Sequence, residues 1–348
     1  MKILNTAVIG LGRIGWQFHI PEIVKNEKYK LTAVVDPLEE RLKEADESFG
    51  SKGYTSIEEM LKNEDPDLVV IASPTPFHKS QTITAMQNGC NVLCDKPLAG
   101  TLTEVDQMVD AMKKYNQKLM VYQPLRFTSE FLALQSVIKS GIIGKIYMIK
   151  GAYSDYTRRN DWQAFLKNGG GMLNNYGAHL IDKMLVLAGS EAETVKCELR
   201  TIAALGDADD VVKALITMKN GIILDIDINM ATAHEIRSWQ IIGEYGSIIP
   251  NSDAGGWLVK YFNPEDIKDI PIDQNLAAPD RMYGSGEIIP WREKEILSSE
   301  FKAINYYDES YKYFASDKKP LVPISETREL MRVLQECRKN NHKKKEIR

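Results

Sequence analysis

The sequence predicts an α/β protein in which a doubly wound, Rossmann-type parallel sheet is followed by an α+β domain built on an open, mostly antiparallel sheet. Three observations predict this class. Short apolar runs alternate with longer amphipathic segments up to about residue 123, a glycine-rich turn follows the first run, and strict apolar–polar alternation appears only later. We expect a first domain over residues 1–123, a second over 124–337 and a basic tail over 338–348.

The composition is that of an ordinary globular protein, with 43% hydrophobic and 26% charged residues in 348. The formal net charge of −4 is uneven, because the tail holds six Lys or Arg against one Glu and leaves the body strongly acidic. An acidic body disfavours nucleic acid or an anionic membrane as the main partner. No apolar run is long enough for a membrane span and no cleavable signal is evident, so we expect a cytoplasmic protein.

Five apolar runs in the first domain have the length of buried strands, and segments of helical period separate them. The strands are expected at Ile3–Ile9, Leu31–Val35, Asp67–Ala72, Asn91–Cys94 and Lys118–Tyr122. The helices are expected at Ile14–Asn26, Leu38–Phe49, Ser56–Lys62, Phe77–Asn88 and Thr103–Tyr115. Because βαβ crossovers are right-handed and cover both faces of a sheet, these elements favour a doubly wound arrangement.

The pattern of apolar and polar residues is different in the expected second domain. Residues 224–230 alternate apolar and polar side chains, and Asn220-Gly221 before them favours a two-residue hairpin turn. The strands are expected at Ile146–Asp155, Val211–Met218, Ile222–Met230, Glu235–Ile242 and Trp257–Phe262. Helices that cover this sheet or pack back on the first domain are expected at Phe127–Ser140, Ala178–Leu187, Glu300–Ala315 and Glu326–Arg338.

A dinucleotide-binding fingerprint lies between the first expected strand and helix. Asp36 ends the next strand, 21 residues after the last glycine of the turn. Glycines permit a tight turn and close approach of a pyrophosphate to helix N–H groups, and the acid meets the ribose hydroxyls. The residues expected to bind the cofactor here are Gly10, Gly12, Arg13, Ile14, Gly15 and Asp36.

The same region predicts NAD in preference to NADP. Asp36 repels a 2′-phosphate, and Pro37 has no N–H group to bind one. Arg13 and Arg41 keep NADP possible because either can pair with a phosphate, although simple surface solvation is the alternative for Arg41.

Three further segments complete the pattern. They are Ala72-Ser73-Pro74-Thr75-Pro76-Phe77-His78, Asp95-Lys96-Pro97-Leu98-Ala99 and residues 169–182, GGGMLNNYGAHLID. With the glycine-rich turn, their order and spacing from residue 3 to about 190 resemble the Gfo/Idh/MocA oxidoreductases, the family of glucose–fructose oxidoreductase and inositol dehydrogenase. The resemblance implies an N-terminal nucleotide domain, a C-terminal domain for substrate and oligomerisation, and NAD or NADP used on sugars, cyclitols or polyols. The resemblance predicts nothing about residues 251–296.

The resemblance also implies site residues. The family's catalytic lysine, in a Glu-Lys-Pro motif, matches Lys96, and its motif with Asp and His four apart matches Asn175 and His179. The histidine is present, whereas asparagine replaces the aspartate. Further cofactor contacts are implied within the first two of these segments, at Ser73, Thr75, His78 and Asp95.

Lys96 is an unusual residue for the end of a buried parallel strand. Such ends face the ligand crevice, where partial desolvation lowers the pKa of an amine toward neutrality. We expect Lys96 to take the hydroxyl proton as hydride leaves, and to return it in the reverse reaction. The alternative is a surface lysine in a loop ended by Pro97.

Asn175 and His179 can face the same crevice because they are four residues apart at a helix start. His179 would hydrogen-bond the reacting hydroxyl or share its proton, and a capping or buried structural histidine is the alternative. Five scattered histidines give no metal-ligand spacing, so no metal is expected.

Other candidates follow strands at the mouth of the crevice. Gln123 is expected to reach the nicotinamide ribose, and Arg126 either contacts substrate or staples the two domains. Residues 155–162 combine an indole, which can cover a sugar face, with groups that fix hydroxyl geometry. The substrate residues expected there are Tyr156, Arg159, Asp161 and Trp162, with a solvated loop as the alternative.

The sequence therefore predicts an NAD(P)-dependent dehydrogenase or reductase acting on CH–OH groups of a sugar, cyclitol or sugar-derived polyol. Two alternatives remain: a redox glycosidase or lyase that keeps its NAD, and a sugar-sensing regulator without turnover. We expect a homodimer or homotetramer, because the open sheet needs cover.

Overall fold

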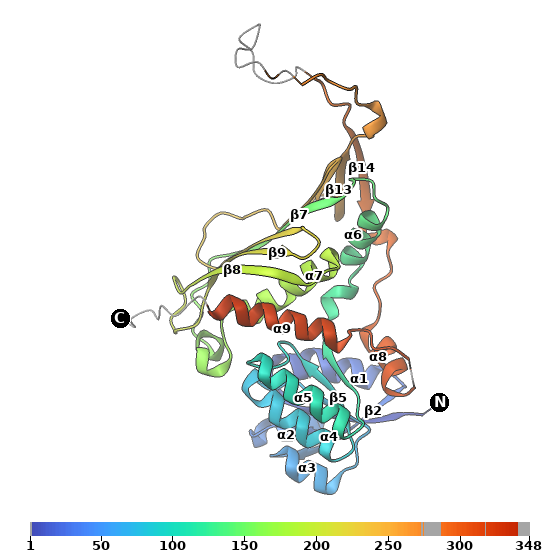
Figure 1. The fold of residues 1–348 in the computed structure, drawn as a ribbon. Helices are drawn as coiled ribbons and strands as arrows, with labels where there is room; N and C mark the ends of the chain where they lie inside the picture. Colours follow the sequence, from blue (N-terminus) through green and yellow to red (C-terminus); the bar gives the residue numbers. More distant parts are fainter. Residues whose placement is uncertain (1, 273, 275–286, 317, 340–348) are drawn as a thin grey trace.

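The computed structural model describes residues 2–272, 274, 287–316 and 318–339 (Figure 1). Within them the chain forms a six-stranded sheet of order β3-β2-β1-β4-β5-β6 and an eight-stranded sheet of order β14-β13-β12-β11-β7-β10-β9-β8. All neighbours in the first sheet are parallel, and in the second all are antiparallel except β7 and β10. The fold class expected from the sequence is confirmed.

The first sheet and its helices follow the expected alternation. The strands are β1 (Leu4–Ile9), β2 (Tyr29–Val35), β3 (Lys52–Tyr54), β4 (Leu68–Ile71), β5 (Asn91–Asp95) and β6 (Leu119–Tyr122). The helices are α1 (Ile20–Lys25), α2 (Glu39–Phe49), α3 (Ile57–Asn63), α4 (His78–Gln87) and α5 (Leu102–Lys114). A π-helical turn, Gly15–His19, precedes α1.

Local chemistry explains where these elements begin. Every side chain of the central strand β4 is buried, as expected for a strand covered on both faces. Thr101 and Glu104 form a reciprocal capping box that starts α5, and Ser56 caps α3 through the Glu59 N–H group.

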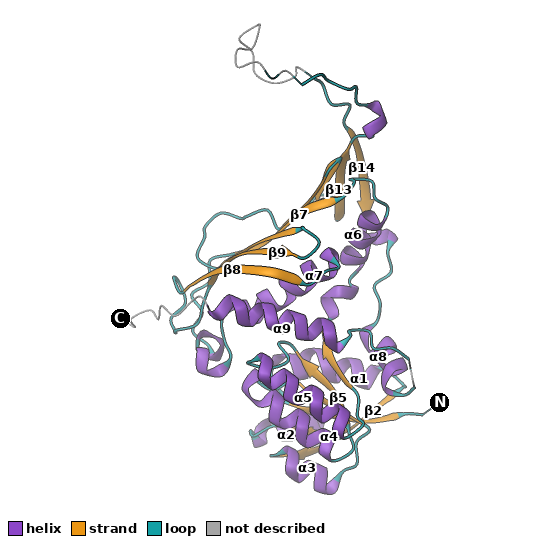
Figure 2. Cartoon of the chain, in the orientation of Figure 1, coloured by secondary structure: helices purple, strands orange, loops and turns teal. Residues whose placement is uncertain are grey.

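The second sheet carries its helices on one face (Figure 2). Its strands are β7 (Ile146–Ser154), β8 (Ala192–Arg200), β9 (Val211–Met218), β10 (Ile223–Asn229), β11 (Trp239–Gly243), β12 (Gly246–Pro250), β13 (Gly256–Tyr261) and β14 (Arg292–Leu297). The later helices are α6 (Ser129–Lys139), α7 (Ala178–Ala188), α8 (Tyr306–Phe314) and α9 (Ile324–Lys339). Leu224, Ile226 and Ile228 are fully buried toward the helices, whereas Asp225 and Asp227 face the open side with Lys213.

Helix α8 packs on the first sheet although it follows the second sheet in sequence. Tyr306, Tyr307 and Phe314 join the core formed by one face of the first sheet with α1 and α2. The opposite face packs on α3, α4 and α5. Helix α9 lies between the two sheets and contacts α5, α7 and β8 (Figure 1). The domain bounds expected from the sequence stay a proposal.

Some elements differ from expectation. Strands β3, β8, β12 and β14 were not expected from the sequence; β3 has only three residues and β14 is mostly charged. The expected helix 300–315 begins only at Tyr306, because the Asn305 side chain caps it by accepting from the Asp308 N–H group.

The first two residues of the expected basic tail belong to a helix. Arg338 and Lys339 belong to α9, and the Arg338 guanidinium donates to Gly100 O at 3.1 Å and to Asn174 Oδ1. Residues 340–348 lie outside the described residues. Among the described residues, no helix is both long and apolar enough to cross a membrane.

Candidate active site

The three glycines of the glycine-rich turn differ in how much free space surrounds them. A Cβ on Gly10 would lie 2.7 Å from Ser73 N, and one on Gly15 would lie 1.9 Å from Gly10 O, so both positions need glycine. A Cβ on Gly12 would meet nothing within 4 Å. Open space beside a turn that enters a helix fits a pyrophosphate.

Asp36 directly follows β2 and hydrogen-bonds the glycine-rich turn. It is 2% exposed, and its Oδ2 accepts from Leu11 N at 2.8 Å and from Arg41 Nη1 at 3.2 Å. Its Oδ1 accepts from Leu38 N at 3.1 Å. Arg41 therefore has a carboxylate partner, whereas Arg13 is exposed and Ile14 is half-buried.

The loop after β4 carries the next expected cofactor residues. The Ser73 hydroxyl donates to Gln81 Oε1 at 2.6 Å, and buried Thr75 lies against Gly169 of the second domain. The two ring nitrogens of His78 contact carbonyl oxygens, Ser73 O at 2.7 Å and Pro97 O at 3.1 Å. These contacts connect the segment after β4 with the segment after β5, and His78 stays a proposed cofactor contact.

Lys96 reaches from the end of β5 to the second domain. Its Nζ donates to Asn175 O at 2.7 Å and lies 3.5 Å from Asn175 Oδ1. Burial lowers the pKa of Lys96, and the carboxylate of Asp95 partly offsets this. Asn175 lies in a second π-helical turn, Leu173–Gly177, a geometry that is frequent at functional sites.

His179 is held in one tautomer. Gln123 Nε2 donates to Ala178 O at 3.4 Å, which turns Gln123 Oε1 toward His179 Nδ1 at 3.1 Å. An oxygen acceptor requires the proton on Nδ1, and therefore leaves Nε2 as an acceptor. Burial, with the positive charges of Lys96 and Lys183, lowers the pKa of His179 well below its usual value and keeps the ring neutral.

Arg126 has two carboxylate partners. Its Nε and Nη2 donate to the two oxygens of Asp182, each at 2.6 Å, and its Nη1 donates to Glu326 Oε2. Arg126 follows β6, Asp182 lies on α7 and Glu326 on α9, so the two ion pairs of Arg126 join three parts of the fold. Because Arg126 is only 6% exposed, this geometry favours the stapling interpretation over substrate contact.

The expected substrate segment is partly ordered by its own side chains. Tyr156 and Trp162 are exposed, by 58% and 47%, while Asp161 accepts from Gln163 N and from Arg159 Nη1. Gln163, which the sequence analysis did not select, connects Arg159 to Asn175. No motif signals it, because its role depends on the fold bringing 163 and 175 together.

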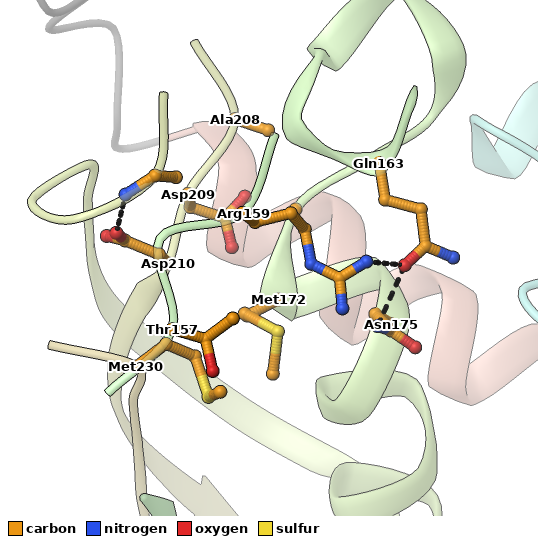
Figure 3. Close-up of a pocket in the computed structure, with 11 residues that line it drawn as sticks. Thr157, Arg159, Gln163, Met172, Asn175, Ala208, Asp209, Asp210 and Met230 are labelled. Carbon is orange, nitrogen blue, oxygen red and sulfur yellow. Dashed lines mark hydrogen bonds between the residues drawn. The ribbon is translucent and has the colours of Figure 1, made fainter. Parts of the chain in front are cut away.

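A small pocket opens beside Asn175 (Figure 3). Its volume is about 10 Å³, room for one water, and Thr157, Arg159, Gln163, Met172, Asn175 and Asp209 contribute to its lining. Burial raises the pKa of Asp209 to about 6, although Leu173 N donates to its carboxylate at 2.8 Å. Among the described residues, no group of three His, Cys, Asp or Glu is placed to hold a metal ion.

Known proteins resemble this arrangement in both halves of the chain. Residues 4–123 match the oxidoreductase family with an NAD-binding Rossmann fold, and residues 131–249 match the GFO/IDH/MocA C-terminal domain. The first match identifies the glycine-rich turn and its sheet as an NAD-binding domain.

Curated relatives match over part of their length. Myo-inositol 2-dehydrogenase of Thermotoga maritima is 28% identical over 222 residues, which cover 62% of this chain and 65% of the relative. D-glucoside 3-dehydrogenase of Escherichia coli is 28% identical over 193 residues, 54% of this chain and 55% of the relative. An uncharacterized oxidoreductase of Schizosaccharomyces pombe is 30% identical over 204 residues, 57% and 55%. The chain thus spans little more than half the length of several curated relatives it matches.

Solved structures share the fold over nearly the whole chain. An NAD-binding protein from Listeria innocua has a TM-score of 0.82 at 23% identity and covers 98% of this chain and 96% of its own. The WlbA dehydrogenase from Bordetella pertussis, in complex with NADH and UDP-GlcNAcA, has a TM-score of 0.77 at 23% identity, with coverage of 97% and 96%. With the two family matches and the site geometry, these comparisons lead to one conclusion: the chain belongs to the Gfo/Idh/MocA family of NAD-binding oxidoreductases.

Proposed function

We propose that the protein transfers a hydride between NAD(P) and a hydroxyl or carbonyl group of a sugar, cyclitol or sugar-derived polyol. The observation that carries the proposal is the partly buried amine of Lys96, which lies 2.7 Å from Asn175 O, at the strand ends beside the NAD-binding turn. Its positive charge also acts on His179. Relatives that are named as inositol and glucoside dehydrogenases support the substrate class.

The residues of the turn fit the cofactor. Gly12 leaves room for the pyrophosphate beside the N–H groups of the following turn, and Asp36 lies where ribose hydroxyls bind. Ser73, Thr75, Asp95 and Gln123 remain proposed cofactor contacts. When bound, the nicotinamide ring supplies the hydride acceptor or donor.

Lys96 is the proposed proton carrier. Its lowered pKa increases the fraction of neutral amine near physiological pH, so Nζ can take the hydroxyl proton during oxidation. In reduction the ammonium returns the proton to the carbonyl oxygen. The surrounding protein holds both forms, because Asn175 offers oxygen acceptors and Asp95 a negative charge.

His179 is proposed to orient the substrate. Its neutral ring presents Nε2 as an acceptor, which suits a hydroxyl of the substrate and can share the reacting proton. Tyr156, Arg159, Asp161 and Trp162 are proposed to form the outer wall of the sugar site, where an exposed indole can cover the C–H face of a ring.

Incubation with NAD and a panel of sugars, cyclitols and polyols tests the proposal. Net formation of NADH supports a dehydrogenase. Cleavage of a glycoside without net NADH would instead identify the redox glycosidase or lyase, and binding without turnover would identify a sensor. Either of the last two results overturns the proposal.

We predict that NAD binds more tightly than NADP. Asp36 is buried next to the turn and carries a charge that repels a 2′-phosphate, while Pro37 lacks an N–H donor. Isothermal titration of the two cofactors measures the difference. Equal or tighter binding of NADP would contradict the prediction and would implicate Arg13 or Arg41 as the phosphate partner.

We predict that Asn175→Asp shifts the oxidative pH profile to higher pH. A carboxylate in place of the amide oxygen, 3.5 Å from Lys96 Nζ, would stabilise the ammonium and raise its pKa by about one unit, or roughly 1.4 kcal/mol. Since oxidation needs the neutral amine, the rise of kcat/KM with pH should begin about one pH unit later in the variant. An unchanged profile, or a shift to lower pH, would show that residue 175 is not electrostatically coupled to Lys96.

We predict a homodimer or homotetramer. Among the described residues no helix covers the open face of the second sheet (Figure 1), and Leu215, which pairs with Asp225 on that face, is 46% exposed. A second copy covering this face would remove the Leu215 side chain from water. Light scattering coupled to size exclusion at micromolar concentration measures the mass, and a monomer would refute the prediction.

A further inference from the structure

A chain of hydrogen bonds runs from Arg159 through Gln163 to Asn175 (Figure 3). The Arg159 Nη1 group donates to Gln163 Oε1. Asn175 Nδ2 donates to the same oxygen at 3.2 Å. On the other side of Asn175, Lys96 Nζ lies 2.7 Å from the main-chain oxygen and 3.5 Å from Oδ1.

The donors in this chain determine how both amides are oriented. A guanidinium has only donors, so Gln163 must turn its oxygen toward Arg159. That oxygen can hold Asn175 only through a donor, so Nδ2 of Asn175 faces Gln163 and Oδ1 faces Lys96. Arg159 thus acts through two side chains, Gln163 and Asn175, to keep the Asn175 Oδ1 acceptor beside the amine of Lys96.

The orientation matters for the proton that Lys96 carries. A neutral amine has two N–H bonds and one lone pair. With both N–H bonds directed at the two oxygens of Asn175, the lone pair points away from Asn175 and is available to a substrate hydroxyl. A reversed amide would direct its Nδ2–H group at the lone pair and occupy it.

We propose that Gln163 is a positioning residue that fixes the Asn175 amide and thereby aims the amine of Lys96 at the substrate. The role of the aimed amine in catalysis rests on the proposed function, whereas the orientation itself does not. Within the described part of the chain, the Gln163 side chain hydrogen-bonds Arg159 and Asn175 and not Lys96, so it acts on Lys96 through Asn175.

The backbone around Gln163 does not depend on its side chain. Its N–H group donates to Asp161 Oδ1 at 3.0 Å, and its carbonyl oxygen accepts from Gly171 N at 3.0 Å. Substitutions at 163 therefore keep the main-chain contacts of the loop, and Gln163→Leu removes the side-chain amide, with the oxygen that accepts from Arg159 and Asn175. Gln163→Glu retains an acceptor for both Arg159 and Asn175.

The charged and titratable groups that act on Lys96 come from two elements. Asp95, on β5, raises its pKa, and His179, on α7, is coupled to it and is neutral. Arg159 lies at the far end of the hydrogen-bond chain. Neither Asp95 nor His179 changes in Gln163→Leu, which also adds no charge, so a shift in the titration of Lys96 in that variant reports the Asn175 amide. Gln163→Glu adds a carboxylate, which can only favour the ammonium form of Lys96.

The test is the pH dependence of Lys96 acetylation by acetic anhydride in the whole protein, followed by mass spectrometry of the peptide that contains Lys96. In Gln163→Leu, a reversed amide can stabilise the neutral amine, so the acid dissociation constant of Lys96 should rise about three- to tenfold, the size of one ordinary hydrogen bond. In Gln163→Glu it should stay at the wild-type value or fall. Gln163→Ala provides a second variant without the acceptor, and Gln107→Leu on the exposed face of α5 is a matched control.

Two results would overturn the proposal: an unchanged Lys96 titration in both Gln163→Leu and Gln163→Ala, or the same change in Gln163→Glu as in Gln163→Leu. The second result would mean that residue 163 acts by packing. Because labelling needs no substrate, it remains decisive even if no sugar is turned over. If a substrate is found, kcat of Gln163→Leu should fall about tenfold or more with KM for NAD unchanged, and Gln163→Glu should recover most of the rate.

Discussion

Lys96→Met is expected to lower the rate of hydride transfer by about 100- to 10,000-fold, the usual effect of removing a positioned acid–base group. Methionine keeps the approximate length of the side chain but cannot carry a proton. The affinity for NAD should change by no more than a few fold, because the proposed pyrophosphate and ribose contacts at Gly12 and Asp36 lie at other strand ends. Stopped-flow measurement of NADH formation and titration calorimetry of NAD measure the two effects separately.

The matched control is Lys62→Met, an exposed lysine on α3 that should leave both quantities unchanged. Turnover of Lys96→Met within threefold of wild type would contradict the prediction and transfer the proton to His179 or Tyr176. Tyr176 stacks on Tyr153 at 3.7 Å between ring centroids, and its pKa is raised, chiefly by burial. A raised pKa leaves very little phenolate to accept a proton near neutral pH, which is why Lys96 is favoured.

Much of the fold could be predicted because local patterns and global contacts agree. Residues 224–230 alternate apolar and polar side chains, and the structure pairs β10 with β9 as antiparallel strands across the expected turn. The missed strand β8 carried the same signal, since Val195, Cys197 and Leu199 alternate with polar residues. Strands β3 and β14 carried none, because they lie at sheet edges where pairing, and not burial, defines them.

The candidate site was predictable where a motif fixes a residue at a strand or helix end. The glycine-rich turn and Lys96 are of this kind. Contacts between distant segments were not predictable: the sequence left open whether Arg126 binds substrate or staples domains, and it gave no reason to select Gln163. Both contacts join residues that are apart in sequence and meet only in the folded chain. Gln163 and Asn175 are 12 positions apart, and Arg126 and Glu326 are 200 positions apart.

Arg126→Met should cost about 3–5 kcal/mol in the free energy of unfolding, since it leaves the carboxylate of Asp182 buried without its partner. Asp182 is 1% exposed, and both of its oxygens accept from Arg126 at 2.6 Å. Urea denaturation measures the loss. The matched control is Arg328→Met, which removes an exposed pair with Asp106 and should cost less than about 1 kcal/mol.

The pH dependence of this loss provides an independent check of its cause. Burial already raises the pKa of Asp182, and loss of Arg126 should raise it further. An acid whose pKa is higher in the folded than in the unfolded protein binds protons preferentially when folded, so acidification favours its folded state. The stability difference between wild type and Arg126→Met should therefore shrink as the pH falls from 8 to 5.

The double variant Arg126→Met/Asp182→Leu, which removes the buried charge as well, should be more stable than Arg126→Met at pH 8. A deficit that is independent of pH and is not relieved in the double variant would mean that Arg126 contributes packing, and that the buried ion pair does not hold the segment after β6 to α7.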